Sequence, residues 1–189
     1  MHIPIPPVAG MHRCNCPAGL TLLELLVALA ITALTLAWSV SSGADWLAHY
    51  RQRSAAQALA EALALARSEA IKRGHRVAVC PSSDGLTCST GPGWETGYLT
   101  FDDLEDDVTA DSDDAVVRRA SAAGHHITIR GNAPVAQYVS YTSLGLARRS
   151  NGALQMGTFT VCRPGAPAIE VVLANGGRTR IQEVAQVCP

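Results

Sequence analysis

The sequence lacks the short motifs on which many enzymes build an active site. It has no Gly-x-Ser-x-Gly nucleophile elbow, no phosphate-binding loop and no dinucleotide-binding fingerprint. Ser82, Ser83 and Asp84 lie together between two cysteines, but without such an elbow. We therefore expect no enzymatic activity and no cofactor. An active site assembled from distant residues is the alternative.

Patterns typical of metal sites are missing as well. Asp111-Ser112-Asp113 begins like a calcium loop but lacks the Gly and the Glu of an EF-hand. His125 and His126 are neighbours on an expected strand, where they would point to opposite faces and could not hold one ion together. No cysteines have Cys-x-x-Cys spacing. The lack of these three ligand patterns argues against a metal site.

Charge is nearly absent from one long stretch near the start of the chain. Residues 20–40 form an apolar run of 21 residues with a single charged side chain, Glu24, and this is about the length that crosses a bilayer as a helix. A carboxylate in such a helix costs about 2.5 to 3.5 kcal/mol on insertion unless it finds a partner. Glu24 is therefore expected to have a function.

The residues before this run are in the wrong order for a secretory signal peptide, in which a small-residue cleavage site follows the apolar core. Here Gly19 precedes it, so cleavage after Gly19 would remove a polar leader and keep the helix. The stretch Gly19-Leu20-Thr21-Leu22-Leu23-Glu24 resembles the processing site of type IV prepilins and pseudopilins, with Leu20 where Phe is usual.

That resemblance implies a role for three residues. A prepilin peptidase would cut after Gly19 and methylate the new amino group of Leu20, and Glu24 would pair with the N-terminal amine of a neighbouring subunit. The leader would be residues 1–19, or nine residues if Met11 is the true start. The alternative is an uncleaved single-span anchor whose stray Glu24 reaches the interface.

The helical pattern continues well past the apolar run. Leu59, Ala62, Leu63, Ala66 and Ala70 recur at steps of three and four, as on one face of an amphipathic helix. Lys72, Arg73 and Gly74 form a plausible helix end. We predict one helix over residues 20–73, roughly 80 Å long, with a transmembrane and assembly half at 20–43 and an amphipathic half at 44–74.

After residue 74 the apolar period changes to two, which indicates β-strands. Short strands are predicted at 76–80, 97–101, 115–119, 126–130, 135–141, 158–162, 169–174 and 179–184. Asn175-Gly176-Gly177 predicts a tight antiparallel hairpin between the last two. The predicted fold is α+β: a long N-terminal helix packed on a small antiparallel β-sheet head at residues 75–189.

Four cysteines remain after Cys14 and Cys16 are removed with the leader. A head outside the cytoplasm would lie in an oxidising compartment, where an even number of cysteines indicates disulfides. Of the three possible pairings we favour Cys80 with Cys88, which brackets a turn-rich loop, and Cys162 with Cys188, which would tie down the chain end. A zinc site is the alternative.

The head itself carries a second resemblance. Residues 66–74, Cys80-Pro81-Ser82, Cys88, residues 94–98 and residues 101–103 together resemble the GspH/FimT family of minor pilins and pseudopilins. The resemblance implies a type IV pilin-like subunit held in the inner membrane by a single pass, with its head in the periplasm. Other pilins in a pilus or pseudopilus would be its partners.

Charge is segregated along the chain. Residues 1–117 have a net charge of −7, and residues 118–189, with eight arginines against two glutamates, have +6. Within the acidic part, residues 102–114 hold eight acidic side chains in thirteen positions, which predicts a solvated loop. The basic part suggests a polyanion partner, although a solvated basic face is the commoner explanation.

The basic part includes Gly177-Arg178-Thr179-Arg180. On a strand, Arg178 and Arg180 would stand on one face and could grip adjacent phosphates. The sequence matches the Gly-Arg-x-Arg element that links the FimT branch of the family, in naturally competent bacteria, to DNA uptake. The resemblance thus implies binding of double-stranded DNA, to which Arg148, Arg149 and Arg163 could contribute. A GspH-type pseudopilin of a type II secretion system, without DNA binding, is the alternative.

Overall fold

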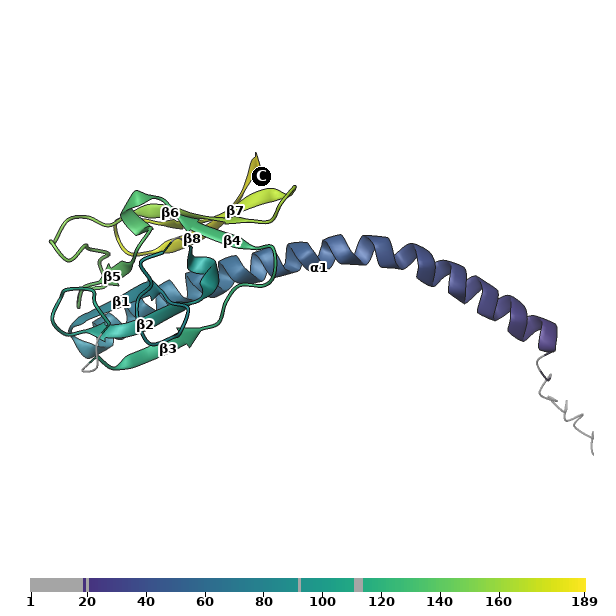
Figure 1. Cartoon of the computed structure of the whole chain (residues 1–189), viewed down its shortest axis with the longest axis horizontal. Coiled ribbons are helices and arrows are strands. Elements are labelled where there is room, and N and C mark those ends of the chain that lie inside the picture. The colour runs from purple at the N-terminus through teal and green to yellow at the C-terminus, as the bar shows by residue number, and fades with distance from the viewer. Residues whose placement is uncertain (1–18, 20, 92, 111–113) are drawn as a thin grey trace, which may run out of the picture. The chain divides into compact units, whose positions relative to one another are not determined.

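The computed structural model describes residues 19, 21–91, 93–110 and 114–189, without the side chains of residues 37–44. The chain divides into two compact units, Met1–Gly43 and Ala44–Pro189. Helix α1, Leu22–Arg73, contributes residues to both (Figure 1). Residues 1–18 and Leu20 lie outside the described residues, and cleavage after Gly19 and methylation of Leu20 stay predictions.

In the first unit, α1 has an apolar and exposed surface. The side chains of residues 21–36 are all exposed, and Leu22 and Leu34 are among the most exposed of them. The backbone N–H of Glu24 donates to Thr21 Oγ1 at 3.3 Å, so Thr21 caps the helix. Among the described residues, no helix is both long and apolar enough to cross a membrane. The predicted span, residues 20–40, extends beyond the side chains that are described.

In the second unit, α1 buries the predicted stripe. Leu59, Ala62, Leu63, Ala66 and Ala70 are at most 1% exposed, which confirms the amphipathic pattern. The helix ends where expected: Gly74 has a left-handed φ of 78° and its N–H donates to the carbonyl of Ala70 at 3.0 Å. A residue with a side chain would be strained there.

The head contains two antiparallel sheets of four strands each, where the sequence suggested a single sheet. One sheet has the order β3-β2-β1-β5 and the other β4-β6-β7-β8 (Figure 1). The elements are β1 (Arg76–Pro81), η1 (Trp94–Thr96), β2 (Tyr98–Asp103), β3 (Val116–Ala120), β4 (Thr128–Gly131), η2 (Ala133–Val135), β5 (Val139–Tyr141), β6 (Gly157–Cys162), β7 (Pro167–Leu173) and β8 (Thr179–Val187).

The α1 segment in this unit and both sheets share one core. It joins Leu63 of α1 to Val79 and Trp94 on one side and to Phe159 and Val171 on the other. The Trp94 and Phe159 rings meet edge to face with centroids 5.0 Å apart. A smaller second core covers the opposite face of β1 and β2. These two strands are therefore buried on both faces, which alternating polarity alone does not reveal.

Two buried glutamines link separate parts of the head. Gln52 Nε2 donates to the carbonyl oxygens of Val161 at 3.0 Å and Pro167 at 2.9 Å, which ties α1 to β6 and β7. Gln155 Oε1 accepts from the Ser140 N–H at 3.0 Å, and both side chains are fully buried. Their hydrogen bonds satisfy backbone groups that would otherwise be unpaired inside the protein.

Both favoured disulfides are present, which confirms that pairing. Cys80 and Cys88 are joined across eight residues, and Cys162 and Cys188 across 26. The first attaches the loop after β1 to the smaller core, and the second attaches the C-terminus to the end of β6. The cysteines therefore fasten two segments that follow strands.

Candidate functional site

The turn between β7 and β8 carries the two arginines of the Gly-Arg-x-Arg element. Leu173 pairs with Thr179, the Ala174 N–H donates to the Arg178 carbonyl at 2.9 Å, and the Gly177 N–H donates to the Ala174 carbonyl at 2.9 Å. The predicted hairpin is confirmed. Gly177 has φ 77°, and a Cβ there would lie 2.4 Å from the carbonyl oxygen of Gly145. Only glycine fits, so this turn and the turn containing Gly145 touch.

Arg178 and Arg180 are both exposed, but their backbones differ. Arg180 is the second residue of β8, and its Nε donates to Gln182 Oε1 at 3.3 Å. Gln182 in turn donates to Glu170 Oε2 at 2.8 Å, so a carboxylate lies on this face. Arg178 precedes the strand and belongs to the turn. Arg178 therefore lies one residue outside the strand on which the sequence interpretation placed both arginines.

Arg178 instead lines a hollow beside α1. This hollow has a volume of about 330 Å³, and its lining includes Arg67, Ile71 and Thr179. Arg67 Nε donates to the carbonyl oxygen of Gly145 at 2.9 Å, which holds its guanidinium at the meeting point of the two turns. Arg67 was missed by sequence reasoning, because a helix position just beside a buried stripe shows no sign of facing a distant turn.

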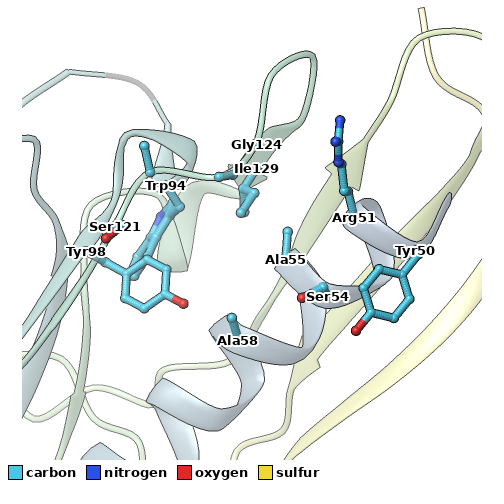
Figure 2. Close-up of a pocket in the computed structure, with 12 residues that line it drawn as sticks. Tyr50, Arg51, Ser54, Ala55, Ala58, Trp94, Tyr98, Ser121, Gly124 and Ile129 are labelled. Carbon is cyan, nitrogen blue, oxygen red and sulfur yellow. The ribbon is translucent and has the colours of Figure 1, made fainter. Parts of the chain in front are cut away.

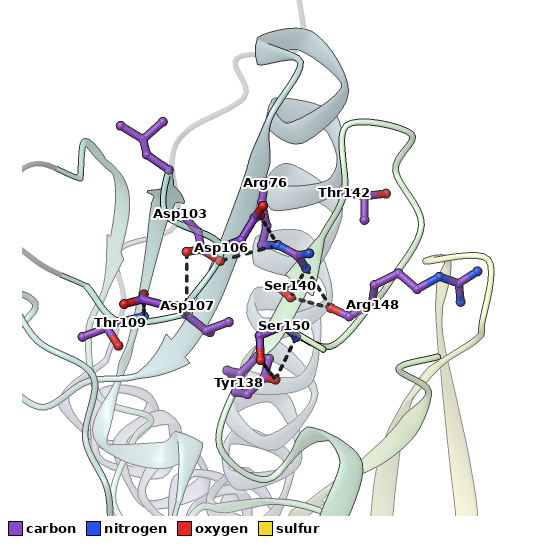
Figure 3. Close-up of polar contacts among 12 residues, drawn as sticks. Arg76, Asp103, Asp106, Asp107, Thr109, Tyr138, Ser140, Thr142, Arg148 and Ser150 are labelled. Atoms are coloured by element: carbon purple, nitrogen blue, oxygen red, sulfur yellow. Dashed lines mark hydrogen bonds and ion pairs between the residues drawn. The ribbon is translucent and has the colours of Figure 1, made fainter. Parts of the chain in front are cut away.

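Arg148 and Arg149 follow the turn that contains Gly145, and both are half-buried. The Arg148 carbonyl accepts from Arg76 Nη1 at 3.2 Å, while its side chain points away from that contact (Figure 3). Arg148 Nη1 is buried and donates no hydrogen bond among the described residues. We define the turn cluster as Arg67 of α1 together with the arginines that follow Gly145 or Gly177 within four residues: Arg148, Arg149, Arg178 and Arg180.

Arg163 is not part of the turn cluster. It lies just after β6, at the Pro167 end of β7, whereas Arg178 lies beyond the Leu173 end. Seven strand residues separate these ends, about 20 Å at the usual rise per residue. Arg163 Nη1 is instead 3.8 Å from Asp45 Oδ1. Arg163 therefore lies apart from Arg178, and its part in a basic surface stays a prediction.

The acidic segment is only partly the solvated loop that was predicted. Asp102 and Asp103 end β2 and are at most 4% exposed (Figure 3 shows Asp103). Arg73 Nη1 lies 2.6 Å from Asp102 Oδ2, and Arg76 Nε lies 2.6 Å from Asp106 Oδ1 and 3.7 Å from Asp103 Oδ2. Burial raises the pKa of Asp103 above its ordinary value. Part of the acidity therefore neutralises arginines inside the head.

Replacing Asp103 by asparagine is expected to change how stability depends on pH. Because the pKa of Asp103 is raised in the folded protein, its contribution to the free energy of unfolding is fully present below the unfolded pKa and lost as pH rises through the folded pKa. Relative to wild type, Asp103→Asn should therefore gain stability as pH rises above about 4, the ordinary pKa of an aspartate. Urea titrations at several pH values measure this gain, with the exposed Glu105→Gln as the control. A difference in stability between Asp103→Asn and wild type that does not change with pH would contradict the assignment.

His125 and His126 lie in a turn before β4, not on the strand that was predicted. His126 has a left-handed φ of 64°, and the two ring centroids are 6.4 Å apart. The expected arrangement on opposite strand faces is therefore wrong. Among the described residues, no group of three or more His, Cys, Asp or Glu side chains could hold a metal ion.

A further hollow of about 310 Å³ lies between α1 and the segment before β4, and its lining is mostly apolar (Figure 2). Trp94 and Tyr98 come from η1 and β2, and Tyr50 and Arg51 come from α1. Burial raises the pKa of Tyr98 to about 12, so this phenol stays protonated at neutral pH. The described lining contains no carboxylate, histidine or cysteine that could act as a base or nucleophile near neutral pH.

Comparison with known families identifies the head. A family model for the type II transport protein GspH matches residues 55–177, about two thirds of the chain. The chain belongs to the GspH family. A second model, the prokaryotic N-terminal methylation motif, matches residues 14–40. Comparison with curated proteins gives no match.

Solved structures were also compared with this chain. The type IV minor pilin FimU of Pseudomonas aeruginosa has a similar fold, with a TM-score of 0.55 and 19% identity over 71% of this chain and 90% of FimU. Another crystal form of FimU gives 0.52 and 20%, over 69% and 91%. The minor pseudopilin EpsH from the Type 2 Secretion System of Vibrio cholerae gives 0.48 and 14%, over 72% and 99%.

The predicted family and the pilin-like α+β fold are thus confirmed. This GspH-family chain is a minor pilin or pseudopilin of a type IV pilus or a type II secretion system. Subunits of this class assemble with other pilins, so the exposed apolar surface of the first α1 unit is consistent with assembly.

Proposed function

We propose that this subunit is a minor pilin of a type IV pilus that binds double-stranded DNA through the turn cluster. The role is one of assembly and binding, without catalysis. A prepilin peptidase would cut after Gly19 and methylate Leu20. The mature chain would then be held in the inner membrane as a single-pass protein with its head in the periplasm. Glu24 would then drive its incorporation into the filament.

The observation that supports DNA binding is the meeting of two arginine-bearing turns. Because Gly177 and Gly145 touch, Arg178 lies in the same hollow as Arg67. Arg67 also contacts the turn that precedes Arg148, through the carbonyl oxygen of Gly145. Arginine guanidinium groups are suited to phosphate oxygens. Contacts of this kind give affinity without base discrimination, so binding should be non-specific and sensitive to salt.

Replacing both Arg178 and Arg180 by glutamine is expected to lower DNA affinity and to flatten its salt dependence. Each lost phosphate contact reduces the slope of log K against log salt by about 0.9, so the double variant should lose about 1.8. Fluorescence anisotropy of labelled duplex DNA with the full-length protein in detergent measures this slope at several salt concentrations.

Two exposed arginines on β3 provide a matched control. Arg118→Gln/Arg119→Gln removes the same charge from an edge strand of the other sheet and should affect DNA binding less. A slope that changes equally in both double variants would mean that only net charge matters. A head without measurable DNA affinity would favour the second candidate, a pseudopilin of a type II secretion system, since the matching family is that of the type II transport protein GspH.

A further inference from the structure

A third hollow in the head has a lining of a different kind. Its volume is about 390 Å³, and Ala48 and Arg51 of α1, the turn at His125 and His126, and Arg163 after β6 surround it. Three separate segments thus bring two guanidinium groups and two imidazole rings to one place. The residues that line it include no carboxylate.

The hollow is built from constrained backbone. Arg163 directly follows Cys162, which is bonded to Cys188, and its carbonyl accepts from the Ala166 N–H at 3.1 Å. His126 keeps a left-handed φ of 64°, a conformation that few residues other than glycine adopt. Basic groups held in place by such a frame lose less freedom when they bind a ligand.

Among the described residues, the positive charge of Arg163 is only partly balanced by a carboxylate. The closest acid recorded for Arg163 is Asp45, whose Oδ1 is 3.8 Å from Nη1 and whose side chain is 87% exposed. Arg163 Nε is buried and donates no hydrogen bond among the described residues. A buried donor without a partner is unfavourable, and an anion with several oxygen acceptors would satisfy it. The hollow therefore fits a phosphate group.

We propose that this hollow binds the phosphate of an anionic phospholipid headgroup while the subunit is stored in the membrane. Ala48 lies only eight residues after residue 40, the end of the predicted membrane segment. Even a fully extended chain of that length spans at most about 29 Å, so headgroup phosphates are within reach. The source of the phosphate rests on the proposed membrane anchoring, whereas the chemistry of the hollow does not.

The test uses the full-length chain in a neutral detergent. Short-chain phosphatidylglycerol, short-chain phosphatidylcholine and inorganic phosphate are titrated separately at constant ionic strength, and NMR follows the ring resonances of His125 and His126. Phosphatidylglycerol should shift these resonances saturably and more strongly than phosphatidylcholine. Arg51→Gln/Arg163→Gln should weaken this response about tenfold or more, because two charge-assisted contacts are lost. Arg118→Gln/Arg119→Gln should leave it within about twofold.

Three other results of these titrations would contradict the proposal in whole or in part. A response to inorganic phosphate alone would assign the site to a soluble anion and overturn the lipid assignment. No response, or one that Arg51→Gln/Arg163→Gln leaves intact, would overturn the site. If that variant instead lowers only the salt slope of DNA binding, the hollow serves DNA. Membrane fractionation tests the anchoring separately, and the turn-cluster variants test DNA binding separately.

Discussion

Replacing Cys162 and Cys188 by alanine is expected to lower the free energy of unfolding of the head by about 3.5 kcal/mol. The disulfide closes a loop with a sequence separation of 26, and the stabilisation follows from the conformational freedom that such a closure removes from the unfolded chain. It also joins the residue that follows β8 to the last residue of β6. Chemical denaturation of the oxidised protein, followed by near-ultraviolet circular dichroism, measures the change.

The other disulfide is the matched control. Cys80 and Cys88 have a sequence separation of 8, so replacing both by alanine should cost about 2.5 kcal/mol under the same model. The order of the two effects is the informative result. If the shorter loop proved the more important, local packing of Cys80 in the smaller core, rather than loop length, would dominate.

Elements with a strong period could be predicted from the sequence. The stripe from Leu59 to Ala70 repeats at helical spacing, and α1 ends within a residue of the expected position because Gly74 suits a left-handed cap. All eight expected strand regions contain a strand, and the turn at Asn175-Gly176-Gly177 joins β7 to β8 as predicted. These features depend on residues close together in the chain.

Features that depend on distant residues could not be predicted. The burial of Asp103 is set by loops that cover a second face of β2, whereas its sequence neighbours are acidic and suggest a solvated loop. Arg67 and Arg178 line the same hollow because Gly145 and Gly177 allow two turns to touch. No pattern of neighbouring residues in the sequence indicates that contact. The division into two sheets depends on which strands pair, and hydrophobic periodicity does not determine strand pairing.

Replacing Glu24 by glutamine is expected to reduce incorporation into filaments about 100-fold or more. Thr21 caps the helix, so Glu24 lies in its first turn, where exposed apolar side chains surround it. In an assembled filament those side chains would pack against other subunits, and the carboxylate would need an opposite charge, which we assign to the amine of Leu20 in a neighbour. Glutamine keeps the shape but leaves that amine buried without its partner, which is strongly unfavourable. Immunoblots of sheared filaments and of membranes measure the ratio.

Two controls separate charge pairing from processing. Mass spectrometry of Glu24→Gln must show an amino end at Leu20, because an uncleaved leader would block assembly for another reason. Glu24→Asp keeps the charge on a shorter side chain and should assemble better than Glu24→Gln. Wild-type incorporation of correctly processed Glu24→Gln would show that the carboxylate has no partner in the filament. A native protein that keeps its leader would instead support the uncleaved anchor, in which Glu24 simply reaches the membrane surface.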